Sequence, residues 1–203
     1  MLHALDAKTG YATTLSIFED LIALAKERPG KLVMASGEVA STPHLGTLLF
    51  IKLTGIDVRV VPFKGGGPAL IDILGGHSDV TFNNIVQAMP HIKSGKLRAL
   101  ANGGLKRSVV LPDVATVAEA ADLAGFENAN WWTILAPAGT PASIVDELAG
   151  ELKAVLSSDD VKKWFLNAGG DVDYVGPADL GAFVKKEIGK FREIAKEANV
   201  QTE

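Results

Sequence analysis

Apolar positions follow two alternating spacings between residues 16 and 102 of this chain. Stretches with apolar residues three or four apart alternate with short, nearly continuous apolar runs, which are typical of amphipathic helices and buried strands respectively. The pattern predicts helices at 16–28, 43–54, 68–74 and 84–94, and strands at 31–35, 58–63, 78–82 and 96–102. Strands and helices that alternate in this way favour an α/β fold, with a mostly parallel sheet covered by helices on both faces.

The pattern changes near residue 130. Trp132–Ala136 is predicted to be one more strand, and three helices are expected at 141–157, 159–168 and 177–199. The last helix needs a partner surface, because an isolated amphipathic helix is unstable in water. Its apolar stripe consists of Leu180, Phe183, Val184, Ile188, Phe191, Ile194 and Ala198. We therefore expect the chain to cross between two structural units around Asn130–Ala136.

Several helix starts carry their own signal. Ser16–Glu19 and Thr116–Glu119 both match the capping box, in which a hydroxyl and a glutamate satisfy backbone N–H groups reciprocally. Thr140 is expected to cap a helix that begins at Pro141, and Ser158 is expected to start the next helix.

Two loops of the predicted sheet hold the clearest functional pattern. Each follows a strand and leads into a helix with a proline near its start, namely Pro43 or Pro68. Ser41 or Thr42 is the expected cap of the first helix, and Gly67 that of the second. Two such units in succession place two helix N-termini near one edge of the sheet, where unpaired N–H groups attract anions. The pattern predicts a binding site for a small anion.

The first loop has two interpretations. In one, N–H groups near Ala40–Thr42, together with the hydroxyls of Ser36, Ser41 and Thr42, hold a carboxylate. In the other, Ser41 or Thr42 only caps the helix, and Ser36 and Gly37 make a turn.

The second loop also leaves alternatives open. Gly65–Gly67 allows the backbone to approach a ligand closely, but it matches neither a Walker loop nor a dinucleotide fingerprint. Lys64 either attracts an anion or is a solvated charge, and Phe63 either lines a pocket or belongs to the core.

Composition and charge exclude several classes of function. A net charge of −4 and a pI near 5.6 argue against nucleic acid as a partner. The chain has no cysteine, so disulfides, thiolate catalysis and zinc–thiolate sites are excluded. Its longest stretch without charged residues, Asn128–Val145, contains prolines and a glycine, so no membrane span is predicted. Met1–Asp6 lacks a basic region followed by an apolar core, so no signal peptide is predicted.

The histidines and hydroxyls form no recognisable catalytic or metal-binding arrangement. No two of the four histidines have the spacing of metal ligands. His44 lies in the first turn of a predicted helix and either assists an anion or caps neighbouring groups. The cluster Gly76–Asp79 lacks the nucleophile elbow, and adjacent residues on a strand point to opposite faces, so they cannot form a relay.

An ordered set of motifs covers the chain from about residue 15 to residue 198. These are Ser36-Gly37, Ser41-x-x-His44-Leu45, Phe50, Thr54-Gly55, Val61-Pro62-Phe63-Lys64-Gly65-Gly66-Gly67-Pro68-Ala69, Asp72, Leu74-Gly75-Gly76, Asp79, Gly95-Lys96-Leu97-Arg98-Ala99-Leu100-Ala101, Arg107-Ser108, Leu111-Pro112-Asp113-Val114-Ala115-Thr116-Val117-Ala118-Glu119, Trp131 or Trp132, and Ala136-Pro137-Ala138-Gly139-Thr140-Pro141. In this order they resemble the solute receptors of tripartite tricarboxylate transporters, the Bug family.

The resemblance implies a periplasmic receptor with the type II periplasmic-binding-protein fold. Such receptors trap a small organic carboxylate between two lobes and deliver it to membrane permease subunits. The resemblance implies no catalytic residue, no metal and no cofactor. The implied ligand-binding residues are Ser36, Gly37, Ala40, Ser41 and Thr42 in the first loop, Phe63, Lys64 and Gly65 in the second, and Asn83 after the third strand.

The chain also departs from the family pattern. Family members begin with an export signal and a glycine-rich first-lobe strand and loop, whereas residues 1–14 form an atypical segment here. Residues 15–131 are expected to form a complete α/β lobe, and residues 132–203 the returning strand and helices of an incomplete other lobe. Glu38, Val39 and Ala40 stand where the family prefers small, glycine-rich residues.

Two alternatives to a receptor follow from these departures and from the loop residues. The first is a truncated remnant or interaction module that binds no solute and self-associates through the incomplete lobe. The second is a hydrolase that uses Ser41 with His44.

Overall fold

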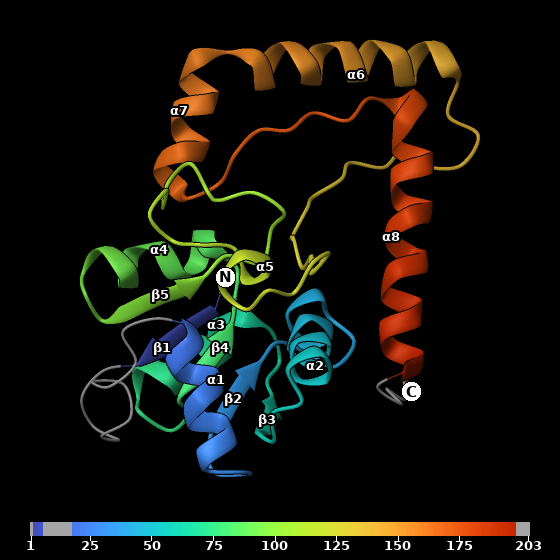
Figure 1. Cartoon of the computed structure of the whole chain (residues 1–203). Coiled ribbons are helices and arrows are strands. Elements are labelled where there is room, and N and C mark those ends of the chain that lie inside the picture. Colours follow the sequence, from blue (N-terminus) through green and yellow to red (C-terminus); the bar gives the residue numbers. More distant parts are fainter. Residues whose placement is uncertain (1, 6–17, 198–203) are drawn as a thin grey trace.

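The computed structural model describes residues 2–5 and 18–197, and Figure 1 shows the arrangement of their elements. The expected capping box at Ser16–Glu19 begins outside the described residues, as does the expected end of the last helix at Asn199.

A five-stranded sheet forms the base of the molecule (Figure 1). Its strands, in spatial order, are β3 (Arg59–Pro62), β2 (Val33–Ser36), β4 (Val80–Phe82), β1 (Leu2–Leu5) and β5 (Leu97–Ala101). The central strand β2 is parallel to β3 and β4, and β1 is antiparallel to β4 and β5. Four of the strands therefore point in one direction, which confirms the mostly parallel sheet that the sequence predicts.

Strand β1 is an element that the sequence analysis did not assign. It lies between β4 and β5, and Leu2 pairs with Phe82 on one side and with Ala101 on the other. Both partners are far away in the sequence, and four residues are too few to show a period. The local pattern therefore cannot reveal this strand.

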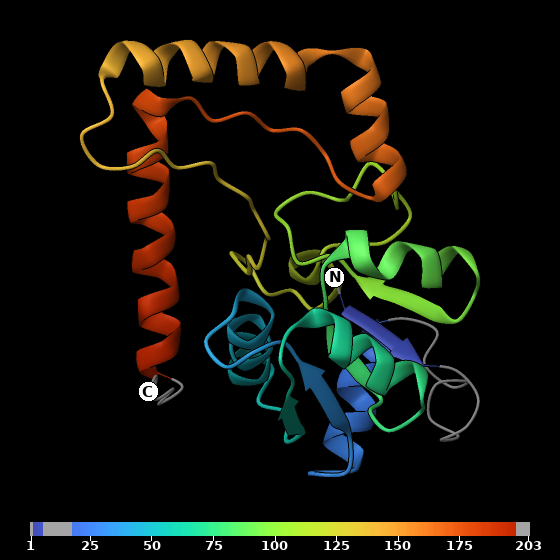
Figure 2. The ribbon, with the colours of Figure 1, turned by 180° about the vertical axis from the view of Figure 1, so that it is seen from behind.

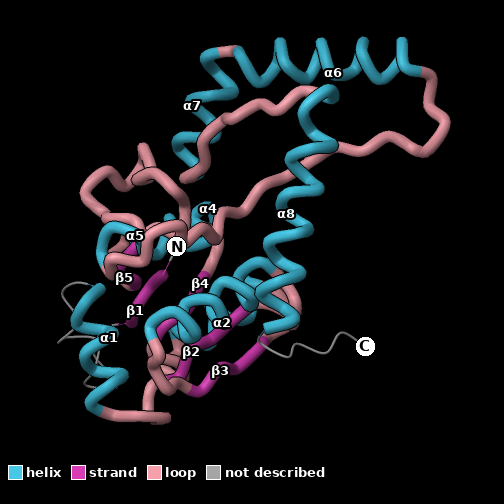
Figure 3. Tube along the Cα trace, turned by 45° about the vertical axis from the view of Figure 1, so that its right-hand side comes forward, coloured by secondary structure: helices cyan, strands magenta, loops and turns pink. Residues whose placement is uncertain are grey.

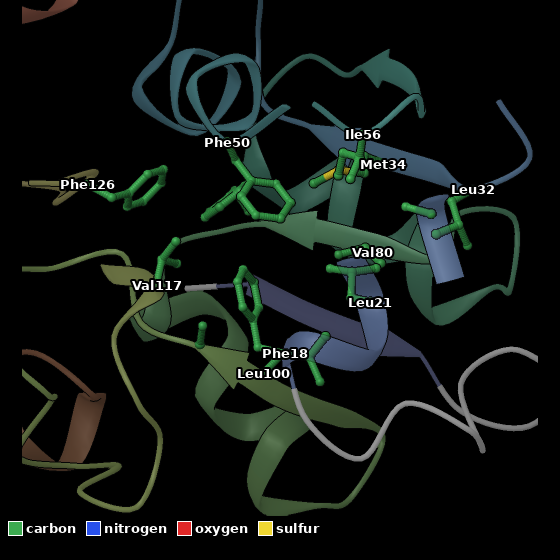
Figure 4. Close-up of a cluster of buried hydrophobic side chains, with 13 residues drawn as sticks. Phe18, Leu21, Leu32, Met34, Phe50, Ile56, Val80, Leu100, Val117 and Phe126 are labelled. Atoms are coloured by element: carbon green, nitrogen blue, oxygen red, sulfur yellow. The ribbon is translucent and has the colours of Figure 1, made fainter. Parts of the chain in front are cut away.

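The main core lies between one face of the sheet and the helices α1 (Phe18–Glu27), α2 (Thr42–Thr54) and α5 (Val117–Ala120) (Figure 4). Phenylalanine rings connect these layers. The Phe50 ring of α2 lies with its centroid 5.2 Å from that of Phe18 and 5.9 Å from that of Phe82. All three side chains are at most 1% exposed, so their burial contributes much of the apolar stabilisation of the lobe.

A second, smaller core covers the opposite face of the sheet. It lies under α3 (Gly66–Leu74) and α4 (Ile85–Lys93), and it consists of Leu70, Ile73, Ala88 and Leu97. We call the layered body that holds both cores, residues 18–128 with β1, the lobe.

The remaining three helices form what we call the arm, residues 129–197. Its helices are α6 (Ala142–Ser157), α7 (Asp159–Ala168) and α8 (Pro177–Glu197). In Figures 1 and 2, α6 lies far from the sheet. Helices α7 and α8 run from the two ends of α6 toward the lobe. None of the described helices of the chain is both long enough and apolar enough to cross a membrane.

Several local expectations are confirmed and others are wrong. Thr116 forms both bonds of the capping box with Glu119, as predicted. The expected strand Trp132–Ala136 is wrong, because this segment has no secondary structure. Thr140 does not cap α6: Pro141 occupies the cap position, and the Thr140 hydroxyl donates to the carbonyl of Pro137. Helix α3 begins two residues earlier than expected, with Gly65 as its cap.

A polar cluster, buried at Glu187, attaches helix α8 to residues 127–131, where the chain passes from the lobe into the arm. The indole N–H of Trp131 donates to Glu187 Oε2 at 3.2 Å, and Glu187 is only 3% exposed. Lys190 Nζ lies 2.8 Å from the other Glu187 oxygen and 3.3 Å from Glu127. The Trp131 ring also packs edge-to-face on Phe183. This cluster fixes the lower part of the arm against the segment where the chain leaves the lobe.

The chain leaves the lobe at Asn128, which packs tightly against the backbone at Gly103 and at Gly46 of α2. The Asn128 N–H donates to the carbonyl of Gly103 at 2.7 Å. Its amide side chain lies against α2, so a Cβ added at Gly46 would stand 1.7 Å from Asn128 Nδ2 and 2.2 Å from Cγ. Asn128 Oδ1 is buried and has no hydrogen-bond partner among the residues that the structure describes. Gly46 is therefore a glycine because the Asn128 side chain occupies the place of its Cβ.

This contact predicts that Gly46→Ala changes the free energy of unfolding in opposite directions in the presence and absence of the Asn128 side chain. Gly46→Ala should lower the free energy of unfolding by about 1–3 kcal/mol, because the added methyl group displaces the buried Asn128 side chain. In the Asn128→Ala background the same substitution should raise it by up to about 1 kcal/mol, because alanine favours the helix over glycine. Urea unfolding of the four proteins measures both effects. A destabilising Gly46→Ala in both backgrounds would contradict this packing.

Candidate functional site

Three loops meet at one edge of the sheet, where the parallel strands β2, β3 and β4 end. The Phe63 N–H donates to the carbonyl of Ser36 at 3.1 Å, which joins the first two loops. Asn83 Nδ2 donates to the carbonyl of Gly66 at 2.8 Å, which joins the third loop to the start of α3. In Figures 1 and 2 the arrowhead of β2 points toward the side of the lobe on which the arm stands. The structure thus brings the loops that the sequence singles out together at the edge where open α/β sheets bind ligands.

The first loop is anchored by its buried beginning. Ser36 is fully buried and its hydroxyl donates to the carbonyl of Gly37 at 3.2 Å, whereas Glu38 is exposed. The Ser41 N–H donates to the carbonyl of Glu38 at 2.9 Å and closes a tight turn. Within this turn Ala40 has φ = +64°, in the left-handed region that disfavours residues with a Cβ.

His44 holds this turn in place from the first turn of α2. Its Nδ1 accepts a hydrogen bond from the N–H of Ala40 at 3.4 Å. The side chain is 8% exposed, and burial lowers its pKa below the ordinary value of 6.5. The imidazole is therefore neutral near pH 7, and it accepts from the loop. Of the two expectations for His44, this contact matches the capping of a neighbouring group.

Helix α2 begins with unused donors at its N-terminus. Ser41 is its cap residue, but the hydroxyl makes no cap hydrogen bond and, among the described residues, is buried without a partner. Within the described part of the chain, the N–H groups of Thr42 and His44 have no protein acceptor. Together with the helix dipole, these N–H groups favour an anion at this point.

Helix α3 starts in a similar way from the second loop. Its cap, Gly65, has φ = +101°, a conformation open to glycine but not to residues with a Cβ. Phe63 is half-buried and Lys64 is exposed. Among the residues that the structure describes, the N–H groups of Gly66 and Gly67 have no protein acceptor. Two helix N-termini with free donors therefore lie on loops that are hydrogen-bonded to one another.

Asn83 is placed to hold the second loop. Its side chain is 3% exposed, donates to Gly66 and accepts from the N–H of Asn84 at 2.7 Å. A Cβ at Gly66 would stand 2.5 Å from Gln87 Oε1 and 2.9 Å from Asn83 Oδ1. The sequence analysis missed Gln87, whose place beside this loop depends on how α4 packs against α3. The sequence analysis likewise did not predict the positive φ of Ala40.

The polar cluster after α3 has a structural role. The Ser78 hydroxyl donates to the Asp72 carboxylate, and the Asp79 carboxylate accepts from the N–H of Val33 at 2.8 Å. Burial raises the pKa of Asp79. His77, Ser78 and Asp79 all lie before β4 begins at Val80, so the expected start of this strand at residue 78 is two residues too early. Within residues 2–5 and 18–197, no group of three potential metal ligands occurs.

Comparison with known proteins identifies a family. A family model described as the tripartite tricarboxylate transporter family receptor, TctC, matches residues 11–200. Protein BugT of Bordetella pertussis is 33% identical over 187 residues, which cover 92% of this chain and 57% of BugT. The chain spans about half the length of the curated relatives it matches.

Solved structures show the same fold. The structure described as R. palustris Rpa4515 with adipate has a TM-score of 0.89 and 32% identity, and the match covers 98% of this chain and 65% of the other. MatC (Rpa3494) from Rhodopseudomonas palustris with bound malate has a TM-score of 0.79 and 28% identity, with 96% and 65% covered. The lobe and arm together therefore correspond to about two thirds of each of these structures.

The strained turn predicts that Ala40→Gly is stabilising. Relief of the left-handed conformation, about 1–2 kcal/mol, should exceed the extra entropy of glycine in the unfolded chain, about 0.4–1 kcal/mol. The free energy of unfolding should rise by about 0.5–1 kcal/mol in urea titrations. Ala154→Gly, at an exposed position of α6, is the matched control and should lower it by about 1 kcal/mol. A loss of stability in Ala40→Gly would show that the turn is not strained.

The environment of His44 predicts a dependence of stability on pH. Because its pKa is lowered in the folded state, the unfolded chain binds the proton more readily. The contribution of His44 to stability is complete above about pH 6.5 and is lost as the pH falls toward the lowered pKa. His44→Gln should therefore show a smaller fall in stability between pH 7 and pH 5 than the unmodified chain. An unchanged slope in His44→Gln would contradict this assignment.

Proposed function

The chain belongs to the family of tripartite tricarboxylate transporter receptors, and on this basis we propose that it binds a small organic carboxylate as a solute receptor. The family and the fold are those of non-enzymatic solute-binding receptors. Two solved relatives are described with adipate and with malate. Both ligands carry two carboxylates, and the helix N-termini of α2 and α3 provide donors for such groups.

One observation carries this proposal: two helix N-termini with free N–H groups lie on loops joined by the hydrogen bond from Phe63 to Ser36. Hydrogen bonds to a charged group contribute about 1.5–3 kcal/mol each. Three or four of them reach about −8 kcal/mol, which corresponds to a micromolar complex, provided that the donors are already in position. The loop contacts supply this preorganisation.

The residues of the site have different roles in this proposal. The first-turn N–H groups of α2 and the Ser41 hydroxyl bind the carboxylate, and Lys64 attracts it electrostatically. Phe63 lines the site beside the apolar part of the solute. The other members form or hold the loops, and they are Ser36, Gly37, Ala40, Thr42, Gly65 and Asn83.

The remaining parts of the proposal rest on the family. Relatives are described as periplasmic binding proteins, so we place this receptor in the periplasm, where it delivers its solute to the membrane permease subunits of the transporter. We further propose that residues 15–131 form the complete solute-binding lobe and residues 132–203 part of a second lobe.

A second candidate function has one observation in its favour. The arm exposes large apolar side chains, among them Trp132, Ile134 and Leu135, which favours an interaction module that self-associates. Nothing in the geometry favours a hydrolase. The Ser41 hydroxyl has no hydrogen-bond partner among the described residues, and His44 Nδ1 accepts from the backbone of Ala40.

The orphaned hydroxyl of Ser41 predicts opposite effects on stability and on binding. Without a ligand, Ser41→Ala should leave the melting temperature unchanged or raise it, because it removes a buried polar group with no partner. Its affinity for adipate or malate in calorimetry should fall about tenfold to a hundredfold, the equivalent of one charge-assisted hydrogen bond.

Ser94→Ala is the matched control, because Ser94 follows α4 and its hydroxyl donates to the carbonyl of His91. This variant should bind as the unmodified chain does. Absence of binding for all mono-, di- and tricarboxylates by the unmodified chain would contradict the receptor proposal. Binding that Ser41→Ala leaves intact would contradict the assigned role of the hydroxyl.

A further inference from the structure

The turn that precedes α2 is strained and needs contacts to hold its shape. Within it, Ala40 has φ = +64°, a conformation that costs energy for a residue with a Cβ and persists only where neighbouring groups fix it. Two hydrogen bonds do so. The Ser41 N–H donates to the carbonyl of Glu38 at 2.9 Å, and the N–H of Ala40 itself donates to His44 Nδ1 at 3.4 Å. His44 is therefore a side chain that supports the strained residue directly.

The hydroxyl of Ser41 takes its position from this turn. A Cβ added at Gly37 would stand 2.8 Å from Ser41 Oγ, so the hydroxyl is folded back over the beginning of the loop. It is buried and has no hydrogen-bond partner among the described residues. Ser41 is also the residue from which α2 starts. A change in the shape of the turn therefore displaces the hydroxyl relative to the first-turn N–H groups of the helix.

The support from His44 exists in only one protonation state. A neutral imidazole can accept a hydrogen bond at Nδ1 and carry its proton at Nε2, whereas an imidazolium is a donor at both nitrogens. Protonation would place an Nδ1–H against the N–H of Ala40, which leaves two donors with no acceptor between them. The His44 side chain is buried, so water offers little compensation and the turn must change its shape.

Burial, and no charged neighbour, keeps His44 neutral near pH 7. The strands packed against α2 are β2 and β4, and neither contains a titratable residue. On α8, which also packs against α2, the buried charge is Glu187, and Lys190 Nζ lies 2.8 Å from its carboxylate. The turn itself carries the exposed Glu38. Burial lowers the pKa of His44, and neither carboxylate offsets this effect.

We propose that His44 is a positioning residue of the carboxylate site: as a neutral acceptor it holds the turn 37–41 in the shape that presents the Ser41 hydroxyl and the N–H groups of α2 to the solute. Figure 3 shows this turn as the loop between β2 and α2. The inference rests on the proposed carboxylate site and adds a condition for binding. Solute affinity should fall when His44 is protonated, because the turn then loses its support. Simple electrostatics predicts the opposite sign, since an imidazolium beside the site would attract a carboxylate.

The test compares the full chain with His44→Asn in calorimetric titrations with malate and adipate from pH 7.5 to pH 5. The side-chain oxygen of asparagine can replace Nδ1 as an acceptor, but it does not titrate. The affinity of the unmodified chain should fall at least about threefold more than that of the variant. Protonation of the solute affects both proteins equally and cancels in this comparison. His44→Gln is a second variant without a titrating group, for use if asparagine unfolds the chain.

A second measurement needs no solute. Hydrogen-exchange protection of the Ala40 and Ser41 amides should fall at least about threefold on the same acidification in the unmodified chain, and it should stay constant in His44→Asn. The amides of β3 are the internal control, and their protection should not change in either protein.

The outcomes separate this inference from the receptor proposal. An affinity that falls equally in both proteins, or that rises in the unmodified chain relative to His44→Asn, would overturn the positioning role and leave carboxylate binding in place. Unchanged protection at Ala40 and Ser41 would overturn it as well. Absence of binding at every pH would instead contradict the receptor proposal, and with it this role.

Discussion

The common direction of β2, β3 and β4 is the constraint on which the rest of this molecule depends. A parallel strand must be followed by a crossover, here a helix, so the starts of α2, α3 and α4 all lie at the edge where these strands end. The unpaired N–H groups at the starts of α2 and α3 thus lie at one edge without any charged side chain, whereas the start of α4 is capped by Asn84. The buried phenylalanines pack α2 against the sheet and so fix the position of the helix.

Buried polar residues near this edge hold backbone segments in place. His44 fixes the turn at Ala40, Asn83 joins the start of α3 to the end of β4, and Asn128 fixes the point where the chain leaves the lobe. The side chains of His44 and Asn83 do so by hydrogen bonds to backbone groups that burial would otherwise leave unpaired. Asn128 does so through its own backbone N–H and the packing of its side chain against Gly46. The donors are therefore ordered when the protein folds, so a ligand binds without the free-energy cost of ordering them.

The lobe and the arm are held together in different ways. The lobe has two closed cores and loops that are hydrogen-bonded to one another. The arm is held at its base by the cluster around Glu187 and at the end of α7, where Gly169 packs against Met89 of α4. Between these points several of its large apolar side chains are exposed, among them Trp132, Ile134 and Trp164.

The sequence by itself determined the α/β class, most helix positions and the two loops, because these follow from local periods and from capping residues such as Thr116. It did not reveal β1, whose partners Phe82 and Ala101 are far along the chain, nor the contacts of Gly46 and Gln87, which exist only after helices pack. It predicted a strand at Trp132–Ala136, which the structure lacks, because side-chain pattern sets a preference and only a neighbouring strand can satisfy the backbone. The hydrogen bonds among the three loops were likewise decided by tertiary structure, since they join residues from separate strands and helices.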